Sequence, residues 1–287
     1  MTVILTKQEA INFLGINQKY FENYYKNSGE IKAYKGKELG NGYTSNWWYF
    51  KKTDLEKWKK MKDSRTVVLS LPEYEKCFEF AIKMAYSFAG SHGTGIRGVR
   101  SEVQMADDFI LGILAEHAVQ KFIKDKFNTK IKLDTEVHHG RIVPQDFDGI
   151  MARGKWRNCK IGVAVKSSKM KSCFNIIPPI EYENGRRKSD VYIFVRVGLP
   201  SDHLFRILRD HSFFKNVSDF LEESDKFRKI KELKNIPMWI CGFSYHKEFS
   251  KATSVPGLRF DNGYRYVKSV ADMHNTDKDW KEFLRLL

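Results

Sequence analysis

The chain has 287 residues, of which 42% are hydrophobic and 14% aromatic, so it is long and apolar enough to bury a sizeable core. Its formal charge of +15 argues against an enzyme of small metabolites and favours a polyanionic partner, because each phosphate neutralised by Lys or Arg releases counterions. A membrane surface is the rival partner, but we find no apolar run of about 18 residues and no signal-like start, and we expect no membrane association. The four cysteines show no CxxC spacing, which favours free thiols in a reducing cytoplasm.

Two short helices are expected at the start of the chain. Thr6 and Glu9 form a capping box, in which each side chain bonds the other residue's backbone N–H. Gly15 interrupts the first helix, Asn17 caps a second one, and Gly29 ends it. This arrangement predicts a helix-turn-helix.

A wing is expected after these helices. Strands are predicted at 31–34 and 46–50, with a basic glycine-bearing loop between them. Thr53 and Glu56 form another capping box, and the helix that they open is expected to bury Leu55 and Trp58. A change of composition at 62–70 divides the chain into an N-terminal domain, 1–62, and a larger domain, 63–287.

The N-terminal segment resembles the excisionase-like and MerR-like winged helix-turn-helix domains. LTKQEAINFLGI at 5–16 and YFKKTDLEKW at 49–58 carry the resemblance, and residues 1–62 contain 12 lysines against 6 acidic residues. The resemblance implies contacts with double-stranded DNA from the second helix and the wing, and the residues expected to make them are Asn17, Gln18, Lys19, Glu22, Lys35 and Lys37. The alternative is a winged domain that binds protein, with its lysines forming only a solvated face.

Two helices are predicted next, at 72–88 and 106–127, from the spacing of their apolar residues. The loop between them, GSHGTGIRGVR at 90–100, is rich in glycine and carries Arg97 and Arg100. Such a loop lets the backbone approach a DNA groove closely, although a plain flexible loop explains it equally well.

The segment Asp146–Lys169 is predicted to form two strands joined by a polar turn, with Asp148 in the first and Lys166 in the second. Strand residues two apart point to the same face, so Ala164 and Lys166 should project together toward Asp148. Asp146 is expected to be a turn or surface carboxylate. Further strands are predicted at 131–137, 190–197 and 238–245.

This order of elements resembles the PD-(D/E)XK nuclease superfamily. The match is carried by Asp148 in VPQDFDGI, by Lys166 in VAVKSS, by the apolar strands DVYIFVRV and WICGF, and by a G-x-x-x-E frame that ends at Glu116. The resemblance implies an α/β fold, with a mixed β-sheet flanked by helices in a restriction-endonuclease-like core and a small N-terminal winged-helix domain.

The same resemblance implies a magnesium-dependent site. Asp148 would be the main metal ligand, joined by the backbone carbonyl of Val165 and by Glu116, with Lys166 beside the attacking water. A solvated glutamate is the alternative for Glu116. Carboxylate-bound Mg²⁺ lowers the pKa of water and neutralises the charge that develops on the phosphate.

Ala164 stands where the superfamily carries an acidic residue two before the lysine. The acid has migrated to Glu181 or Glu183, or the protein only binds DNA, or an engineered alanine replaces a glutamate in an inactivated form. The third explanation is favoured, because the alanine is the one residue out of place in an otherwise ordinary strand.

The function expected from these features is a sequence-specific endonuclease for double-stranded DNA, such as a Type II restriction enzyme of a bacterium, archaeon or phage. We expect it in the cytoplasm and as a homodimer on DNA. The alternatives are a DNA-binding regulator of a mobile element with a vestigial nuclease fold, and a structure-selective nuclease.

Overall fold

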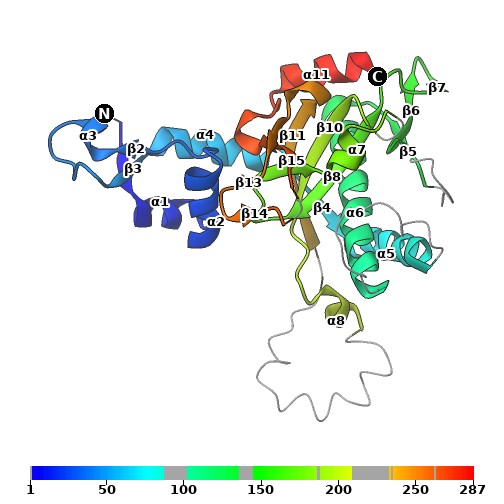
Figure 1. Cartoon of the computed structure of the whole chain (residues 1–287), viewed down its shortest axis with the longest axis horizontal. Coiled ribbons are helices and arrows are strands. Elements are labelled where there is room, and N and C mark those ends of the chain that lie inside the picture. Colours follow the sequence, from blue (N-terminus) through cyan, green and yellow to red (C-terminus); the bar gives the residue numbers. More distant parts are fainter. Residues whose placement is uncertain are drawn as a thin grey trace, which may run out of the picture.

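A four-stranded mixed sheet forms the centre of the computed structural model (Figure 1). Its order is β4-β11-β10-β8, with bounds Thr66–Ser70, Asn235–Tyr245, Val191–Val197 and Val163–Lys169. β10 runs parallel to β8 and antiparallel to β11. Every residue of β10 is buried, which explains its nearly continuous apolar sequence, since a strand covered on both faces does not alternate. The structure describes residues 2–86, 102–135, 145–185, 188–208, 233, 235–261 and 263–287.

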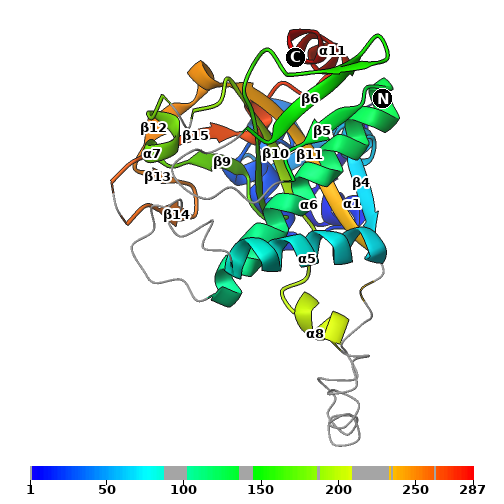
Figure 2. The same cartoon turned by 90° about the vertical axis from the view of Figure 1, so that its right-hand side faces the viewer.

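Helices cover one face of this sheet. α6 (Glu102–Phe127) packs against it and α5 (Leu71–Tyr86) packs against α6, as Figure 2 shows. The apolar stripe of α6 meets the inward side chains of β8 and β10, and α11 (Asp277–Leu286) adds Trp280 and Phe283 to the same core. The two predicted central helices are therefore confirmed.

The first part of the chain has the predicted helices but a different strand pattern. Its elements are β1 (Ile4–Thr6), α1 (Lys7–Leu14), α2 (Gln18–Glu22), η1 (Asn23–Asn27), β2 (Tyr34–Lys35), α3 (Gly36–Leu39), β3 (Trp48–Lys51) and α4 (Lys52–Asp63), with strand order β1-β3-β2. The capping box of Thr6 and Glu9 is present, Gly15 ends α1 with φ of 62°, and Asn17 caps α2. The prediction of a second capping box at Thr53 and Glu56 is wrong, because α4 begins at Lys52 and has no side-chain cap. Leu55 and Trp58 are buried as expected.

This first part packs on the face of the central sheet opposite α6. Phe21, Tyr24 and Trp58 lie in one apolar cluster with Phe194 of β10 and Trp239 of β11. The Tyr24 and Trp58 rings both meet the Trp239 ring edge-on, with centroids 5.7 and 5.5 Å away. The N-terminal elements, drawn in blue in Figure 1, thus share a core with the sheet.

A buried ion pair lies in this shared core. Both terminal nitrogens of Arg196 bind the Glu30 carboxylate, at 2.9 and 2.5 Å, and Arg196 Nε donates to the Ser172 carbonyl. The guanidinium carbon lies 4.7 Å from the centre of the Tyr24 ring and 4.5 Å from that of Trp239. Strand β10 is therefore bound to the N-terminal part of the chain by an ion pair and by aromatic packing.

A three-stranded sheet of order β5-β6-β7 lies beside the central sheet, with bounds Ile131–Leu133, Phe147–Ala152 and Lys155–Arg157. β6 and β7 form a hairpin that the sequence did not predict. The strand of Asp148 is consequently not the neighbour of the strand of Lys166, because β8 pairs with β10. The two sheets meet at Asp146, whose N–H donates to the Val163 carbonyl at 3.1 Å.

The remaining strands form a further small sheet and a hairpin, and β9 of that sheet shares an apolar cluster with β8. A sheet of order β12-β15-β9 comprises Ser250–Ala252, Arg265–Ser269 and Phe174–Ile177, and a hairpin joins β13 (Ser254–Val255) to β14 (Leu258–Arg259). Short helical segments complete this part of the chain, namely α7 (Pro179–Tyr182), α8 (His203–Leu208), η2 (His246–Glu248) and η3 (Val270–Asp272). In the described part of the chain, every helix is too short or too polar to span a membrane.

Candidate active site

Lys166 lies at the centre of a cluster of charged side chains. It belongs to β8, and its Nζ is 2.5 Å from Glu181 Oε1. Glu181 is carried by α7, the single helical turn that Pro179 starts directly after β9. The two side chains are 29% and 21% exposed, so their ion pair is largely withdrawn from water.

Asp146 joins this cluster from the start of β6. Its carboxylate accepts the Val165 N–H at 2.5 Å, and its own N–H bonds Val163. These two bonds fix Asp146 against β8 immediately before Lys166. The expectation of a turn or surface carboxylate at this position is therefore wrong.

Asp148, the expected main ligand, is paired with a different lysine. Its side chain is 50% exposed and is bound by Lys132 Nζ at 2.5 Å. The cause is a bulge in β6: Leu133 pairs with Phe147 and Lys132 with Gly149, which leaves Asp148 without a partner. An extra residue of this kind breaks the alternation of faces on which the expectation rested. The aspartate that lies against the strand of Lys166 is therefore Asp146, and not Asp148.

Glu116 belongs to α6 and is partly buried. Burial raises the pKa of its carboxyl well above the ordinary value, and the negative charge of Asp146 raises it further. Burial likewise raises the pKa of Asp146 to about 6, although Lys166 and the Val165 N–H both act to lower it. Asp134, whose N–H donates to the Asp146 carbonyl at 3.3 Å, adds to the repulsion at both carboxyls.

The pKa of Lys166 is raised. Burial lowers the pKa of an ammonium group, but here the attraction of Glu181 and then of Asp146 outweighs it. Lys166 is therefore charged at neutral pH, and it shares the cluster with four carboxyl groups, those of Glu116, Asp134, Asp146 and Glu181. The repulsion between carboxyl groups that raises the pKa values of Glu116 and Asp146 would be relieved by a further cation in the cluster.

The donor set fits a hard divalent cation such as Mg²⁺, which prefers carboxylate and carbonyl oxygens and keeps several waters. Asp146, Glu181 and Glu116 are the carboxylates that could hold it, and the Val165 carbonyl belongs to the residue whose N–H binds Asp146. Within the residues that the structure describes, however, no three His, Cys, Asp or Glu side chains stand close enough to hold a metal ion, so these carboxylates would have to move closer together to bind one.

Ala164 shares its strand face with Lys166, as expected. It is 6% exposed and lies in an apolar cluster with Ile177, Tyr182, Tyr192 and Phe249. The small side chain leaves room for this cluster, while Glu181 approaches the lysine from α7.

Glu183, the other candidate for the missing acid, is engaged elsewhere. Its Oε1 accepts the hydroxyl groups of Tyr264 at 2.7 Å and Tyr266 at 2.8 Å, and the side chain is exposed. These bonds lower the pKa of Glu183 and raise that of Tyr266 to about 12. Of the two glutamates, only Glu181 reaches Lys166.

The residues expected to contact DNA lie at the N-terminal end of the molecule. The Asn17 side chain caps the Lys19 N–H at 2.8 Å, and Glu22 accepts from Gln18 at 3.0 Å and from Lys7 at 2.7 Å. Gln18 and Lys19 themselves are exposed on α2.

The two lysines that the sequence led us to expect on a wing have different surroundings. Lys35 lies over the Trp48 ring, and Lys37 is exposed on α3 rather than on a loop. Arg97 and Arg100 fall outside the described residues.

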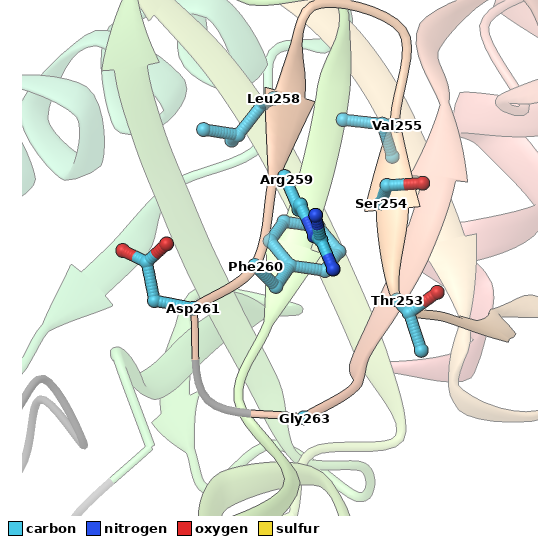
Figure 3. Close-up of a pocket in the computed structure, with 8 residues that line it drawn as sticks. All are labelled: Thr253, Ser254, Val255, Leu258, Arg259, Phe260, Asp261 and Gly263. Carbon is cyan, nitrogen blue, oxygen red and sulfur yellow. The ribbon is translucent and has the colours of Figure 1, made fainter.

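A hollow of about 700 Å³ lies elsewhere, at the β13–β14 hairpin (Figure 3). It is lined by Thr253, Ser254, Val255, Leu258, Arg259, Phe260, Asp261 and Gly263. None of these residues belongs to the cluster around Lys166, so the hollow is separate from the candidate site.

Comparison of the chain with protein-family models, curated proteins and solved structures finds no significant match in any of the three. The case for a function therefore depends on the site itself. The sequence led us to expect Lys166 and Glu116 in this cluster; it led us to take Asp146 for a turn or surface carboxylate, and it gave no expectation for Asp134. The one signal for Glu181 was its position just after the strand that follows Lys166, within a proline-initiated turn.

Proposed function

We propose that the chain is a magnesium-dependent endodeoxyribonuclease with a restriction-endonuclease-like core and an N-terminal winged helix-turn-helix domain. The observation that carries this proposal is the ion pair of Lys166 with Glu181, next to Asp146, whose carboxylate is bound by the N–H of the residue just before the lysine. A charged lysine beside carboxylates that need a cation suits the hydrolysis of a phosphodiester, whose anion repels hydroxide.

The proposed roles follow from the positions of the residues. Asp146, Glu181 and Glu116 would hold the metal, which when bound lowers the pKa of water and neutralises charge on the phosphate. The raised pKa of Lys166 keeps its ammonium group charged, so that it orients the attacking water and stabilises the negative charge of the transition state. Glu181 keeps the lysine in place through their ion pair.

The migrated acid is the explanation of Ala164 that this geometry supports. Glu181 lies 2.5 Å from the lysine and stands in for the residue two before it. The position of Ala164 among tyrosines and Phe249 favours a small side chain there. We therefore propose that the chain is active as it stands, in place of the inactivated form favoured from the sequence.

Double-stranded DNA is the proposed substrate, and a homodimer on DNA is the proposed assembly, because cutting both strands requires two such sites. The charge of +15 supplies the attraction to the DNA backbone. A sequence-specific restriction enzyme of the cytoplasm fits a site and a DNA-reading unit in one chain.

The test is cleavage of supercoiled plasmid DNA in the presence of Mg²⁺. The chain should convert the plasmid to discrete linear fragments, and Lys166→Ala should lower the rate at least about a hundredfold. DNA affinity, measured with Ca²⁺ in place of Mg²⁺, should stay nearly unchanged, because the lysine acts on the transition state.

Lys132→Ala is the matched control, since Lys132 pairs with the exposed Asp148 and should leave the rate unaltered. No cutting by the unsubstituted chain would favour the DNA-binding regulator, and a preference for branched DNA would favour the structure-selective nuclease.

A further inference from the structure

Two neighbouring tryptophans at the N-terminal end of the molecule are exposed to solvent. Trp47 is 62% exposed and Trp48 is 39% exposed. Large aromatic side chains are usually buried, because exposing them forfeits the hydrophobic free energy of their wide faces. Neither residue has a role in the function proposed above.

Lysines accompany the aromatic rings on this pair of strands. β2 and β3 pair Tyr34 with Tyr49 and Lys35 with Trp48. Lys35 Nζ lies 4.0 Å from the centre of the Trp48 ring and donates to the Asn46 carbonyl at 3.1 Å. Lys51 Nζ lies 4.3 Å from the centre of the Tyr34 ring. Each ammonium group is thus held close to an aromatic face by a cation–π contact.

The positive charge of this surface distinguishes between two possible partners, a second copy of the chain and a polyanion. Residues 1–62 carry 12 lysines and 6 acidic residues, so the same surface on a second copy would be repelled. A polyanion is attracted instead. Nucleic acid combines the two features that the surface matches, phosphates for the lysines and flat base faces for the indole.

We propose that Trp47, beside the lysine-covered Trp48, stacks on an unpaired or unstacked base of the DNA substrate. This inference rests on the proposed function for the identity of the substrate. Bases inside a regular duplex already stack on each other, so Trp47 reaches a base only where the duplex is kinked, bulged or ended. The lysines hold the neighbouring phosphates, and the indole distinguishes distorted from regular DNA.

The test compares the affinity of the full chain for two labelled oligonucleotide duplexes, one with a single unpaired adenine and one fully paired. Fluorescence anisotropy is measured without divalent cations, so that no cutting occurs. Trp47→Ala should weaken binding to the duplex with the unpaired base about tenfold and binding to the paired duplex much less. Trp47→Phe, which retains an aromatic face, should recover most of the loss. The loss should persist at high salt, because stacking releases no counterions.

Trp156→Ala is the matched control, because Trp156 is 50% exposed on β7 and belongs to another part of the molecule. Equal affinities of Trp47→Ala and the unsubstituted chain for both duplexes would overturn the proposal. So would a change of oligomeric state in Trp47→Ala by sedimentation, or binding to anionic vesicles that depends on Trp47. Plasmid cleavage by the same preparations separates the two proposals, since loss of stacking with retained cutting overturns only this one.

Discussion

Asp146 carries an unfavourable charge at neutral pH, since burial raises its pKa to about 6 from an ordinary value of 3.8. In the window between these values the folded protein binds a proton that the unfolded chain releases. The free energy of unfolding therefore falls as the pH rises through this window. Above this pH window the buried carboxylate is charged and lowers the free energy of unfolding by its full amount. Below the window the carboxyl is protonated in both states and has no such effect.

Asp146→Asn should therefore stabilise the protein above pH 6 and not below pH 4. An amide still accepts the Val165 N–H, so the hydrogen bond is kept while the charge is removed. Thermal unfolding should show a melting temperature higher by about a few degrees at pH 7.5, and the difference should vanish toward pH 4. A variant that is less stable at every pH would show that Lys166 already compensates the charge.

Magnesium supplies the control for this interpretation. A ligand that binds only the folded state stabilises it, and a carboxylate must be ionised to bind a metal. Mg²⁺ should raise the melting temperature of the unsubstituted chain above pH 6 and leave Asp146→Asn almost unaffected.

At the same scale, Asp146 illustrates why the site was only partly predictable. The residue types and the position of Lys166 follow from the local sequence. The choice between Asp146 and Asp148 depends on a bulge between β5 and β6, which arises from the pairing of two strands about 15 residues apart. No alternation pattern within one strand contains that information.

At the scale of elements, the ion pair of Arg196 and Glu30 joins β10 to the N-terminal part of the molecule. Its side chains are 0% and 3% exposed, so removing one partner leaves the other charged and buried. Glu30→Ala should lower the free energy of unfolding by about 3–5 kcal/mol. Chemical denaturation measures this directly.

A double variant distinguishes the pair from packing alone. Glu30→Leu combined with Arg196→Met replaces the pair with apolar side chains and should recover most of the lost stability. If the double variant were as unstable as the single one, the hydrogen bond to Ser172 and the stacking on Tyr24 and Trp239 would be the larger contributions.

Helices whose ends are marked by capping residues were predicted close to where they lie, whereas the β6–β7 hairpin, whose turn has a weaker sequence signal, was not. Thr6, Gly15 and Asn17 determine helix ends through their own side chains or backbone, so α1 and α2 were expected where they lie. The β6–β7 hairpin was not predicted, because its turn needs a positive φ at both Arg153 (49°) and Gly154 (77°), and the sequence signals only the glycine, since arginine rarely adopts this conformation.

At the scale of the whole molecule, the predicted boundary near residue 62 stays a prediction, but the apolar core crosses it. Phe194, Trp239 and Cys241 of the sheet lie in one cluster with Phe21 and Tyr24. A fragment that begins at residue 63 would expose these side chains. We expect it to unfold at a markedly lower temperature than the full chain, as measured by calorimetry, and to associate through the exposed face. An unchanged melting temperature would show that the two parts fold independently.

The shared core also bears on recognition. Asn23 Nδ2 donates to the Lys171 carbonyl at 3.2 Å and Tyr24 OH to that of Met170 at 2.9 Å, so the residues after α2 are tied to the loop that follows β8. The same strand carries Lys166. In the proposed function, an N-terminal part fixed in this way would set a constant distance between the bases that it contacts and the bond that is cut.

The central claim is that Glu181 supplies the acid that position 164 lacks, and plasmid cleavage in Mg²⁺ by four forms of the chain tests it most directly. The unsubstituted chain and Glu183→Gln should cut, because Glu183 is bound to Tyr264 and Tyr266 and not to Lys166. Glu181→Gln should lose about a thousandfold in rate. Ala164→Glu should gain nothing, since its carboxylate would enter the cluster of Tyr182, Tyr192 and Phe249. The opposite pattern, with no cutting by the unsubstituted chain and metal-dependent cutting by Ala164→Glu, would contradict the claim and return the acid to position 164.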